Sequence, residues 1–246
     1  MFKRGKKNKS DEELQSLPLV LTDADEKPLV TLPSDVVVDL RQMVTRIGRE
    51  ENLPKRLAVV SALRQEGVSF ISRGLAMIMA HDLSVAVCLV ELNWWDSDHS
   101  FLKDNPDIQG SDMGGLAAVL AEEAELDDIL LETGYANLWI APSGEMARQD
   151  RPVMARSQKL KELINELGSR FDHLILDVPA ILYTSDAVPL ASLSSACCVV
   201  VRQGVTPVND VRQALDEIDH LPMVGVVLNN AKMATPSFIT KLIPQK

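Results

Sequence analysis

Apolar residues follow two spacings along most of the chain. Short runs rich in valine, leucine and alanine alternate with longer segments in which apolar residues recur every three to four positions. The first spacing predicts buried strands and the second predicts amphipathic helices. Strands are predicted at 57–61, 85–92, 138–141, 173–177, 196–202 and 224–229, and helices at 35–50, 69–81, 115–122, 153–167 and 207–220.

The alternation of strands and helices predicts an α/β fold with a doubly wound, mostly parallel sheet flanked by helices. Most of the strands are apolar throughout, as expected when helices cover both faces of a sheet. Residues 1–34 are polar, with three prolines among short apolar runs, and are predicted to be a flexible basic and polar lead. Residues 35–246 are predicted to be one domain, with a surface loop at 96–114.

The composition is that of a folded globular protein, with 46% hydrophobic and 24% charged residues. No apolar run reaches the roughly 18–20 residues of a membrane helix, and no apolar segment follows the basic start as in a secretory signal. Cys88, Cys197 and Cys198 lie in apolar runs, which indicates buried thiols in a reducing compartment. A cytoplasmic location is therefore expected.

The net charge of −10 is unevenly distributed. Five of the 25 basic residues fall within residues 1–10, which leaves 20 basic against 35 acidic residues in the remainder. An acidic body argues against nucleic-acid binding. The basic start is either a solvated tail or a contact to anionic lipid, so a peripheral position at the inner face of the cell membrane stays open.

The segment after the first predicted strand occupies the place of a phosphate-binding loop. Gly67 and Ser69 stand where such a loop has a glycine and a magnesium-binding hydroxyl, but Val68 stands where it has its lysine. A strand, a turn with one glycine and a helix occur in any α/β protein. By itself the loop is therefore a weak indication of phosphate binding.

Polar residues also end two later strands. Glu91 and Asn93 lie two residues apart, on one side of an extended chain, and Asp177 closes the strand 173–177. Ligands of such sheets bind beyond the carboxyl ends of the strands, where Asp177 has the place of a magnesium-water ligand. The alternative for Asp177 is a helix cap or turn residue before Pro179.

Seven segments between about Ser34 and Asn230 carry a resemblance to a known family. They are 60–70 (VSALRQEGVSF), 89–95 (LVELNWW), 115–144 (GLAAVL to NLWIAPSG), 171–180 (FDHLILDVPA), 185–187 (SDA), 199–206 (VVVRQGVT) and 225–229 (GVVLN). In this order they resemble the cytoplasmic kinase domain of bacterial tyrosine kinases, the CpsD/CapB type of exopolysaccharide synthesis. That family belongs with the MinD/ParA-like P-loop ATPases, and the resemblance implies their fold.

The resemblance also implies ligands and partners. ATP or ADP with magnesium is the implied cofactor, with Gly67, Val68 and Ser69 at the phosphate loop and Asn229 near the adenine. Ser69 and Asp177 are the implied magnesium ligands, and Glu91, Asn93 and Asp177 stand at the acidic-motif positions. The implied partner is a membrane polysaccharide co-polymerase or export protein, and homo-oligomer formation stays open.

The departures from the family gather where its reaction occurs. Val68 replaces the lysine, Gln65 a glycine and Phe70 a threonine. Gln65 adds a Cβ where the backbone is expected to need a positive φ or close phosphate contact. Asn93 replaces an aspartate and cannot act as a base. The family's oligomer-forming E-x-x-R-x-x-R aligns with Val38, Arg41 and Val44, and the tyrosine-rich tail is missing.

Two functions follow from this pattern. The first is a non-catalytic, degenerate kinase-like regulator or partner in exopolysaccharide or capsule biosynthesis and export, and the missing lysine and tyrosine tail favour it. The alternative is an ATPase or protein-tyrosine autokinase of the same pathway that uses an altered loop. A MinD/ParA-like positioning protein is a weaker third, because Leu63 stands where that group has an extra lysine. Trp94 and Trp95 are either a partner contact or part of a loop that packs on the body.

Overall fold

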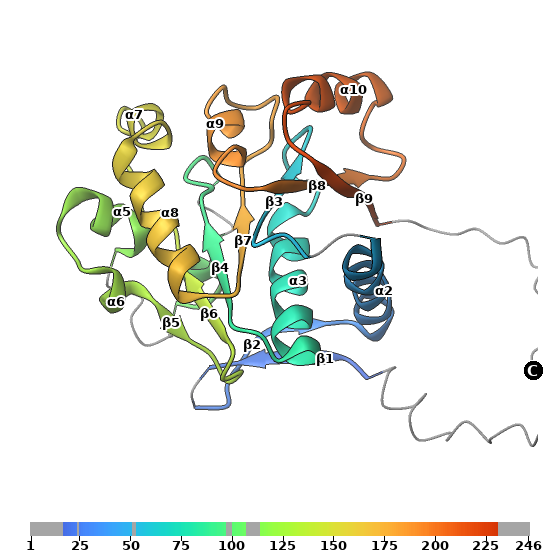
Figure 1. Ribbon diagram of the computed structural model, residues 1–246, viewed down its shortest axis with the longest axis horizontal. Helices are drawn as coiled ribbons and strands as arrows, with labels where there is room; N and C mark the ends of the chain where they lie inside the picture. Colours follow the sequence, from blue (N-terminus) through green and yellow to red (C-terminus); the bar gives the residue numbers. More distant parts are fainter. Residues whose placement is uncertain (1–16, 24, 51–52, 97–99, 107–113, 231–246) are drawn as a thin grey trace, which may run out of the picture.

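The computed structural model describes residues 17–23, 25–50, 53–96, 100–106 and 114–230 (Figure 1). The strands are β1 (Leu19–Thr22), β2 (Pro28–Leu32), β3 (Arg56–Ser61), β4 (Val87–Glu91), β5 (Leu131–Glu132), β6 (Leu138–Ala141), β7 (His173–Asp177), β8 (Ala196–Arg202) and β9 (Met223–Asn229). The helices are α2 (Ser34–Glu50), α3 (Val68–Leu83), α4 (Phe101–Asp104), α5 (Gly115–Ala121), α6 (Leu126–Ile129), α7 (Arg151–Ala155), α8 (Gln158–Arg170), α9 (Ala187–Ala191) and α10 (Val208–Glu217).

The main sheet has seven strands in the order β5-β6-β4-β7-β3-β8-β9. All its neighbours are parallel except β5 and β6. The predicted α/β fold with a mostly parallel sheet is thereby confirmed. Because β3, β4 and β7 are parallel neighbours, their carboxyl ends meet at one edge of the sheet, which is where a ligand site is expected.

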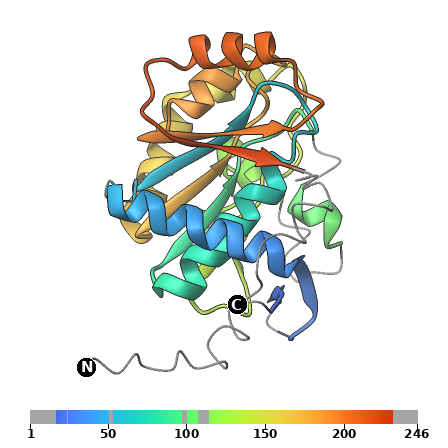
Figure 2. The same ribbon diagram turned by 90° about the vertical axis from the view of Figure 1, so that its right-hand side faces the viewer.

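Each face of the sheet carries its own apolar core. One core holds Leu40 of α2 and Leu75 of α3, and the other holds Leu160 of α8 and Leu190 of α9. Figures 1 and 2 show α2 and α3 lying together on the same face. Cys197 belongs to one core and Cys198 to the other, so these adjacent thiols face opposite ways, as alternation along a strand requires.

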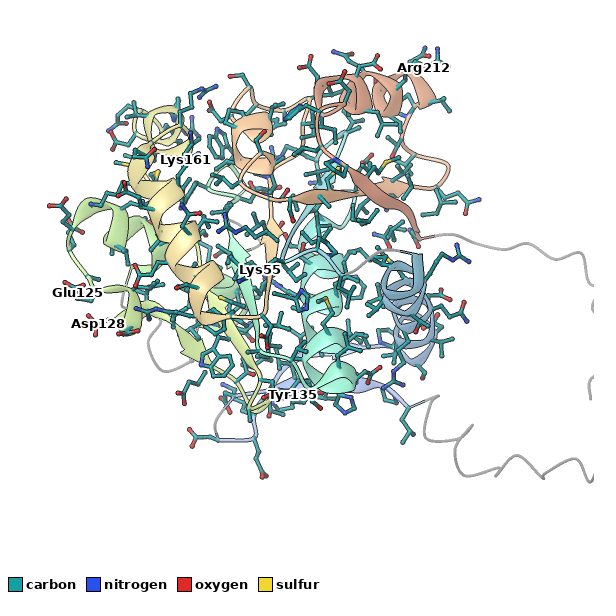
Figure 3. All side chains as sticks on the ribbon, viewed as in Figure 1. Lys55, Glu125, Asp128, Tyr135, Lys161 and Arg212 are labelled. Carbon is teal, nitrogen blue, oxygen red and sulfur yellow. The ribbon has the colours of Figure 1, made fainter. Side chains whose placement is uncertain are left out.

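The predicted flexible lead is wrong for the part of it that the structure describes. β1 and β2 form an antiparallel hairpin that buries Leu21 and Leu32 against the core shared with α3. The Tyr135 hydroxyl (Figure 3) donates to the Val20 carbonyl at 2.9 Å and ties the hairpin to the body. Prolines and short apolar runs hid these strands from the sequence pattern. Residues 1–16 lie outside the described part of the chain.

Three further elements differ from the prediction. The helix expected at 153–167 is two helices, because the Ser157 hydroxyl accepts a hydrogen bond from the Leu160 backbone and starts α8. The loop expected at 96–114 contains α4, while 97–99 and 107–113 lie outside the described residues. The two-residue strand β5 is too short for a periodic pattern to reveal.

Membrane crossing is a separate question from the fold. Among the residues that the structure describes, no helix combines the length and the apolar character that crossing a bilayer requires. The longest of these helices, α2, has 17 residues and includes charged ones.

Candidate functional site

The loop between β3 and α3 has the backbone shape of an anion-binding loop. Gly67 precedes α3 with φ +95°, and Gln65 has φ +63°. The positive φ expected at Gln65 is confirmed, and for a glutamine this conformation is uncommon. The loop delivers the chain to the N-terminus of a 16-residue helix, where backbone N–H groups and the helix dipole favour negative charge.

Polar side chains fasten this loop to the ends of the neighbouring strands. The Asn229 amide donates to the Glu66 carbonyl at 2.8 Å, and the Thr206 hydroxyl donates to the Glu66 carboxylate. Glu66 is buried and its Oε2 has no hydrogen-bond partner. Asn229, implied by the resemblance to lie near adenine, therefore holds the loop in the structure. The adenine contact itself stays a prediction.

Gly67→Ala should destabilise the protein by about 2 kcal/mol. The substitution places a side chain at a positive φ, which costs on the order of 1–3 kcal/mol. A Cβ on Gly67 would also stand 2.1 Å from Asn229 Nδ2, so this amide must move and release Glu66. Urea unfolding measures the loss. Gly204→Ala is the control, because its φ is also positive but nothing lies within 4 Å of its Cβ position. Equal losses in the two variants would mean that the Asn229 contact has no effect.

Val68 and Ser69, the first residues of α3, differ in what they offer to a ligand. Val68 is 9% exposed and packs into the core beneath α3, although it also borders the cavity above the loop. The position that would need a lysine for phosphate is thus an apolar core position. The Ser69 hydroxyl faces Asp177, and its hydrogen bond favours the ionised form of that carboxyl. The structure therefore brings together the predicted pair Ser69 and Asp177.

Two buried carboxyls end adjacent strands beside this pair. Glu91 and Asp177 are register partners at the ends of β4 and β7, and each is 2% exposed. Burial, and secondly the charge of Glu91, raises the pKa of Asp177 to about 7. Burial also raises the pKa of Glu91, against the opposing effect of Arg73. Asp177 Oδ1 is buried without a hydrogen-bond partner.

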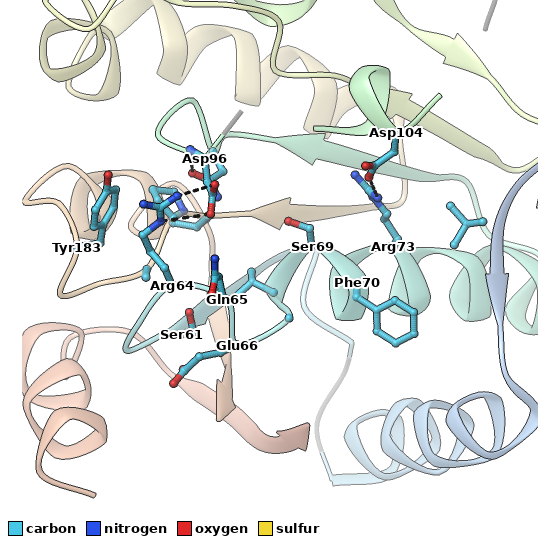
Figure 4. Close-up of a pocket in the computed structure, with 17 residues that line it drawn as sticks. Ser61, Arg64, Gln65, Glu66, Ser69, Phe70, Arg73, Asp96, Asp104 and Tyr183 are labelled. Carbon is cyan, nitrogen blue, oxygen red and sulfur yellow. Dashed lines mark hydrogen bonds and ion pairs between the residues drawn. The ribbon is translucent and has the colours of Figure 1, made fainter. Parts of the chain in front are cut away.

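Arg73 supplies the positive charge next to these carboxyls. Its guanidinium donates to Glu91 Oε1 at 3.2 Å. It also donates to Asp104 Oδ2 at 2.6 Å, as Figure 4 shows. Neither Arg73 nor Asp104 is among the site residues predicted from the sequence. The signal was available, because Arg73 lies four residues after Ser69 on one helix face and is the one charged residue in the apolar stretch from 68 to 80.

The outer rim of the site is formed by Arg64. It pairs with Asp96 at 2.7 Å, and its guanidinium carbon lies 4.6 Å from the centroid of the Tyr183 ring (Figure 4). Asn93 borders the same cavity, and its side-chain oxygen accepts a hydrogen bond from the Asp96 backbone at 3.2 Å. The amide at position 93 thus shapes the turn that presents Asp96 to Arg64.

These residues enclose a cavity of about 400 Å³ at the carboxyl ends of the strands. Five carboxyls stand in or beside it, those of Glu66, Glu91, Asp96, Asp104 and Asp177, against the guanidiniums of Arg64 and Arg73. Within the described ranges, no three His, Cys, Asp or Glu residues are arranged to hold a metal ion. With no lysine at position 68 and with Glu91 held by Arg73, the residues present do not fit magnesium with a triphosphate.

The tryptophan pair follows the site residue Asn93. Trp94 is 1% exposed, and its Nε1 donates to the Ser143 carbonyl at 2.8 Å. Trp95 is half-buried and packs against the same core. The packing alternative therefore holds for Trp94, while Trp95 packs on the same core and stays partly exposed.

The oligomer-forming positions of the family lie on α2. Val44 is buried, and Arg41 pairs with Asp82 of α3 within the chain, at 2.6 Å. The partly retained motif therefore contributes to packing between helices. Whether this protein forms oligomers stays an open prediction.

Known proteins that are similar in sequence or structure cover about 80% of this chain. No family model matches the chain. Tyrosine-protein kinase CpsD of Streptococcus agalactiae is 26% identical over 200 residues, which are 80% of this chain and 83% of that protein. The VpsO kinase domain superposes with a TM-score of 0.68 at 20% identity, over 80% of this chain and 94% of that one.

Another protein of similar structure was determined with a bound nucleotide. The septum site-determining protein MinD of Pyrococcus horikoshii, complexed with Mg-ADP, superposes with a TM-score of 0.56 at 18% identity, over 79% of each chain. At these identities the two structures establish the fold, and the CpsD match adds the relationship in sequence. In sequence this chain is similar to the bacterial tyrosine kinases, and its fold is that of the MinD-like P-loop ATPases.

Proposed function

We propose that this protein is a non-catalytic, degenerate kinase-like regulator in exopolysaccharide or capsule biosynthesis and export. The observation that carries the proposal is Val68, an apolar side chain packed into the core where the family's loop lysine would reach phosphate. Loss of a single donor to a developing charge lowers rates by roughly 10²–10³. The protein acts by binding a membrane polysaccharide co-polymerase or export protein rather than by phosphate transfer.

The charges of the pocket support this proposal. Arg64 and Arg73 are already paired with carboxylates of the chain. A triphosphate would have to compete with these carboxylates for both guanidiniums. Asn93 further weakens the case for phosphate transfer, since an amide cannot take a proton from a tyrosine hydroxyl.

A second function is favoured by one observation. Asp177 Oδ1 is buried without a hydrogen-bond partner beside Ser69, which is a place for a magnesium-bound water. An ATPase or autokinase of the same pathway would use this pair together with an altered loop. If the protein is such an enzyme, the wild-type chain should bind ATP with measurable affinity. The first proposal expects no such binding.

Calorimetric titration with ATP and MgCl₂ separates the two functions. The wild type should release no binding heat at ATP concentrations up to about 1 mM, a range that detects the weak end of nucleotide affinities. Val68→Lys with Gln65→Gly restores the lysine and removes the strained Cβ, and should gain at least tenfold in affinity. Val68→Met with Gln65→Gly is the matched control, because it adds length without charge.

The outcomes bear on the proposal in opposite ways. Binding by the lysine variant alone shows that the loop has lost its phosphate ligand on an intact fold. Micromolar binding by the wild type would overturn the non-catalytic proposal. Phosphotransfer and hydrolysis assays with Asp177→Ala would then be needed to distinguish a kinase from an ATPase.

A further inference from the structure

Arg73 is an unusual residue for its position in the fold. The helix α3 packs against the sheet, and the residues on either side of Arg73 in the chain, Ser72 and Gly74, are buried. The Arg73 side chain is itself only 11% exposed. A buried guanidinium is costly unless partners compensate its charge. A charged residue at this buried position therefore calls for a specific role.

The partners of Arg73 come from three separate segments. Glu91 ends β4, Asp104 belongs to α4, and Asp177 at the end of β7 is close enough to interact electrostatically. The ring of Phe101 lies 5.4 Å from the guanidinium carbon. The backbone N–H of Phe101 donates to Glu91 at 2.9 Å, so the carboxylate that pairs with Arg73 also anchors the start of α4. One cation thus joins the ends of two strands to a helix.

We infer that Arg73 is a built-in substitute for a divalent cation. It neutralises Glu91 and Asp104 and reduces the repulsion between Glu91 and Asp177, which is the electrostatic work that a bound metal ion would otherwise do. The pocket consequently keeps its shape without metal and without nucleotide. This inference rests on the proposed function, in which no cycle of nucleotide and metal binding sets the shape of the pocket.

The chemistry of the site predicts what happens when the substitute is removed. Without a guanidinium, Glu91 and Asp104 lose the cation that they share, and Asp177, which interacts electrostatically with Glu91, lies beside the Ser69 hydroxyl. Carboxylate and hydroxyl oxygens are the ligands that Mg²⁺ prefers, and the unbalanced charge adds to the attraction. Arg73→Gln should therefore turn a protein that is indifferent to Mg²⁺ into one that Mg²⁺ stabilises.

Thermal unfolding with MgCl₂ alone, in the absence of nucleotide, tests the inference. Wild type, Arg73→Gln, Arg73→Lys and the double variant Arg73→Gln with Glu91→Gln are compared in EDTA, in MgCl₂ and in NaCl of equal ionic strength. Arg73→Gln should melt lower in EDTA and rise by about 3–5 °C in Mg²⁺ at tenfold its Kd. The other three proteins should shift by less than about 1 °C, since each has either a cation or fewer carboxylates.

Each outcome decides the question. Equal Mg²⁺ shifts in the wild type and in Arg73→Gln would overturn the inference, as would the absence of any shift. If Arg73→Gln is unfolded in EDTA, refolding on addition of Mg²⁺ supports the inference and failure to refold refutes it. The proposed function fails separately, through ATP binding by the wild type, because this titration contains no nucleotide.

Discussion

Asp177→Asn should make the protein more stable above pH 7, by an amount on the order of 4 kcal/mol. Asp177 is buried at the end of β7, and burial raises its pKa from the ordinary value of 3.8 to about 7. The wild type must therefore either keep this carboxyl protonated or hold a buried charge next to Glu91. Asparagine has a similar shape and removes both demands.

The dependence on pH follows from proton linkage. Between pH 3.8 and about 7, the folded state binds the Asp177 proton and the unfolded state has released it. Stability therefore falls as pH rises through this window, by about 1.4 kcal/mol per pKa unit. The advantage of Asp177→Asn should be absent below pH 4, grow between pH 4 and 7, and stay constant above pH 7.

Urea unfolding at pH 4, 5.5 and 8, in EDTA, measures this difference. Asp216→Asn, on the exposed face of α10, is the control and should match the wild type at all three values. An Asp177→Asn protein less stable than the wild type at pH 8 would contradict the expectation. It would mean that the ionised carboxylate contributes a net attraction, with Arg73 the nearest source.

The order of strands and helices was predictable because each long element has a regular spacing of apolar residues. The strands β3, β7 and β8 are runs of buried aliphatic residues, and they fall within one residue of their predicted bounds. The hairpin of β1 and β2 was not predictable in this way. β1 buries only alternate residues, Leu19 and Leu21, and β2 buries only Leu32, while prolines precede β1, begin β2 and follow it. Tertiary contacts, including Tyr135 to Val20, hold it in place.

The candidate site was predictable in position but not in its charge balance. Gly67, Ser69, Glu91 and Asp177 were identified because they stand at the ends of strands or at the start of a helix. Arg73 stands one turn inside α3, outside the segments that carry the family resemblance. Asp104 fell in a stretch predicted to be loop. Their pairing depends on how α4 lies over α3, which a sequence pattern does not encode.

Trp94→Ala should cost about 4 kcal/mol of stability, which is typical of a large aromatic residue removed from a core. The ring is 1% exposed in the core that also holds Leu92 and Leu116. Its removal also leaves the Ser143 carbonyl without the indole donor. The adjacent Trp95 is half-buried, so Trp95→Ala should cost only about 1 kcal/mol.

The contrast between the two tryptophans bears on function as well as stability. Trp94 follows Asn93, whose oxygen holds the turn that presents Asp96 to Arg64. Trp94→Phe keeps most of the volume but loses the hydrogen bond, and should cost about 2 kcal/mol. Urea unfolding followed by circular dichroism gives all three values. If Trp94→Ala and Trp95→Ala lose equally little, the pair is not a packing feature, and a role in partner contact becomes the better account of both rings.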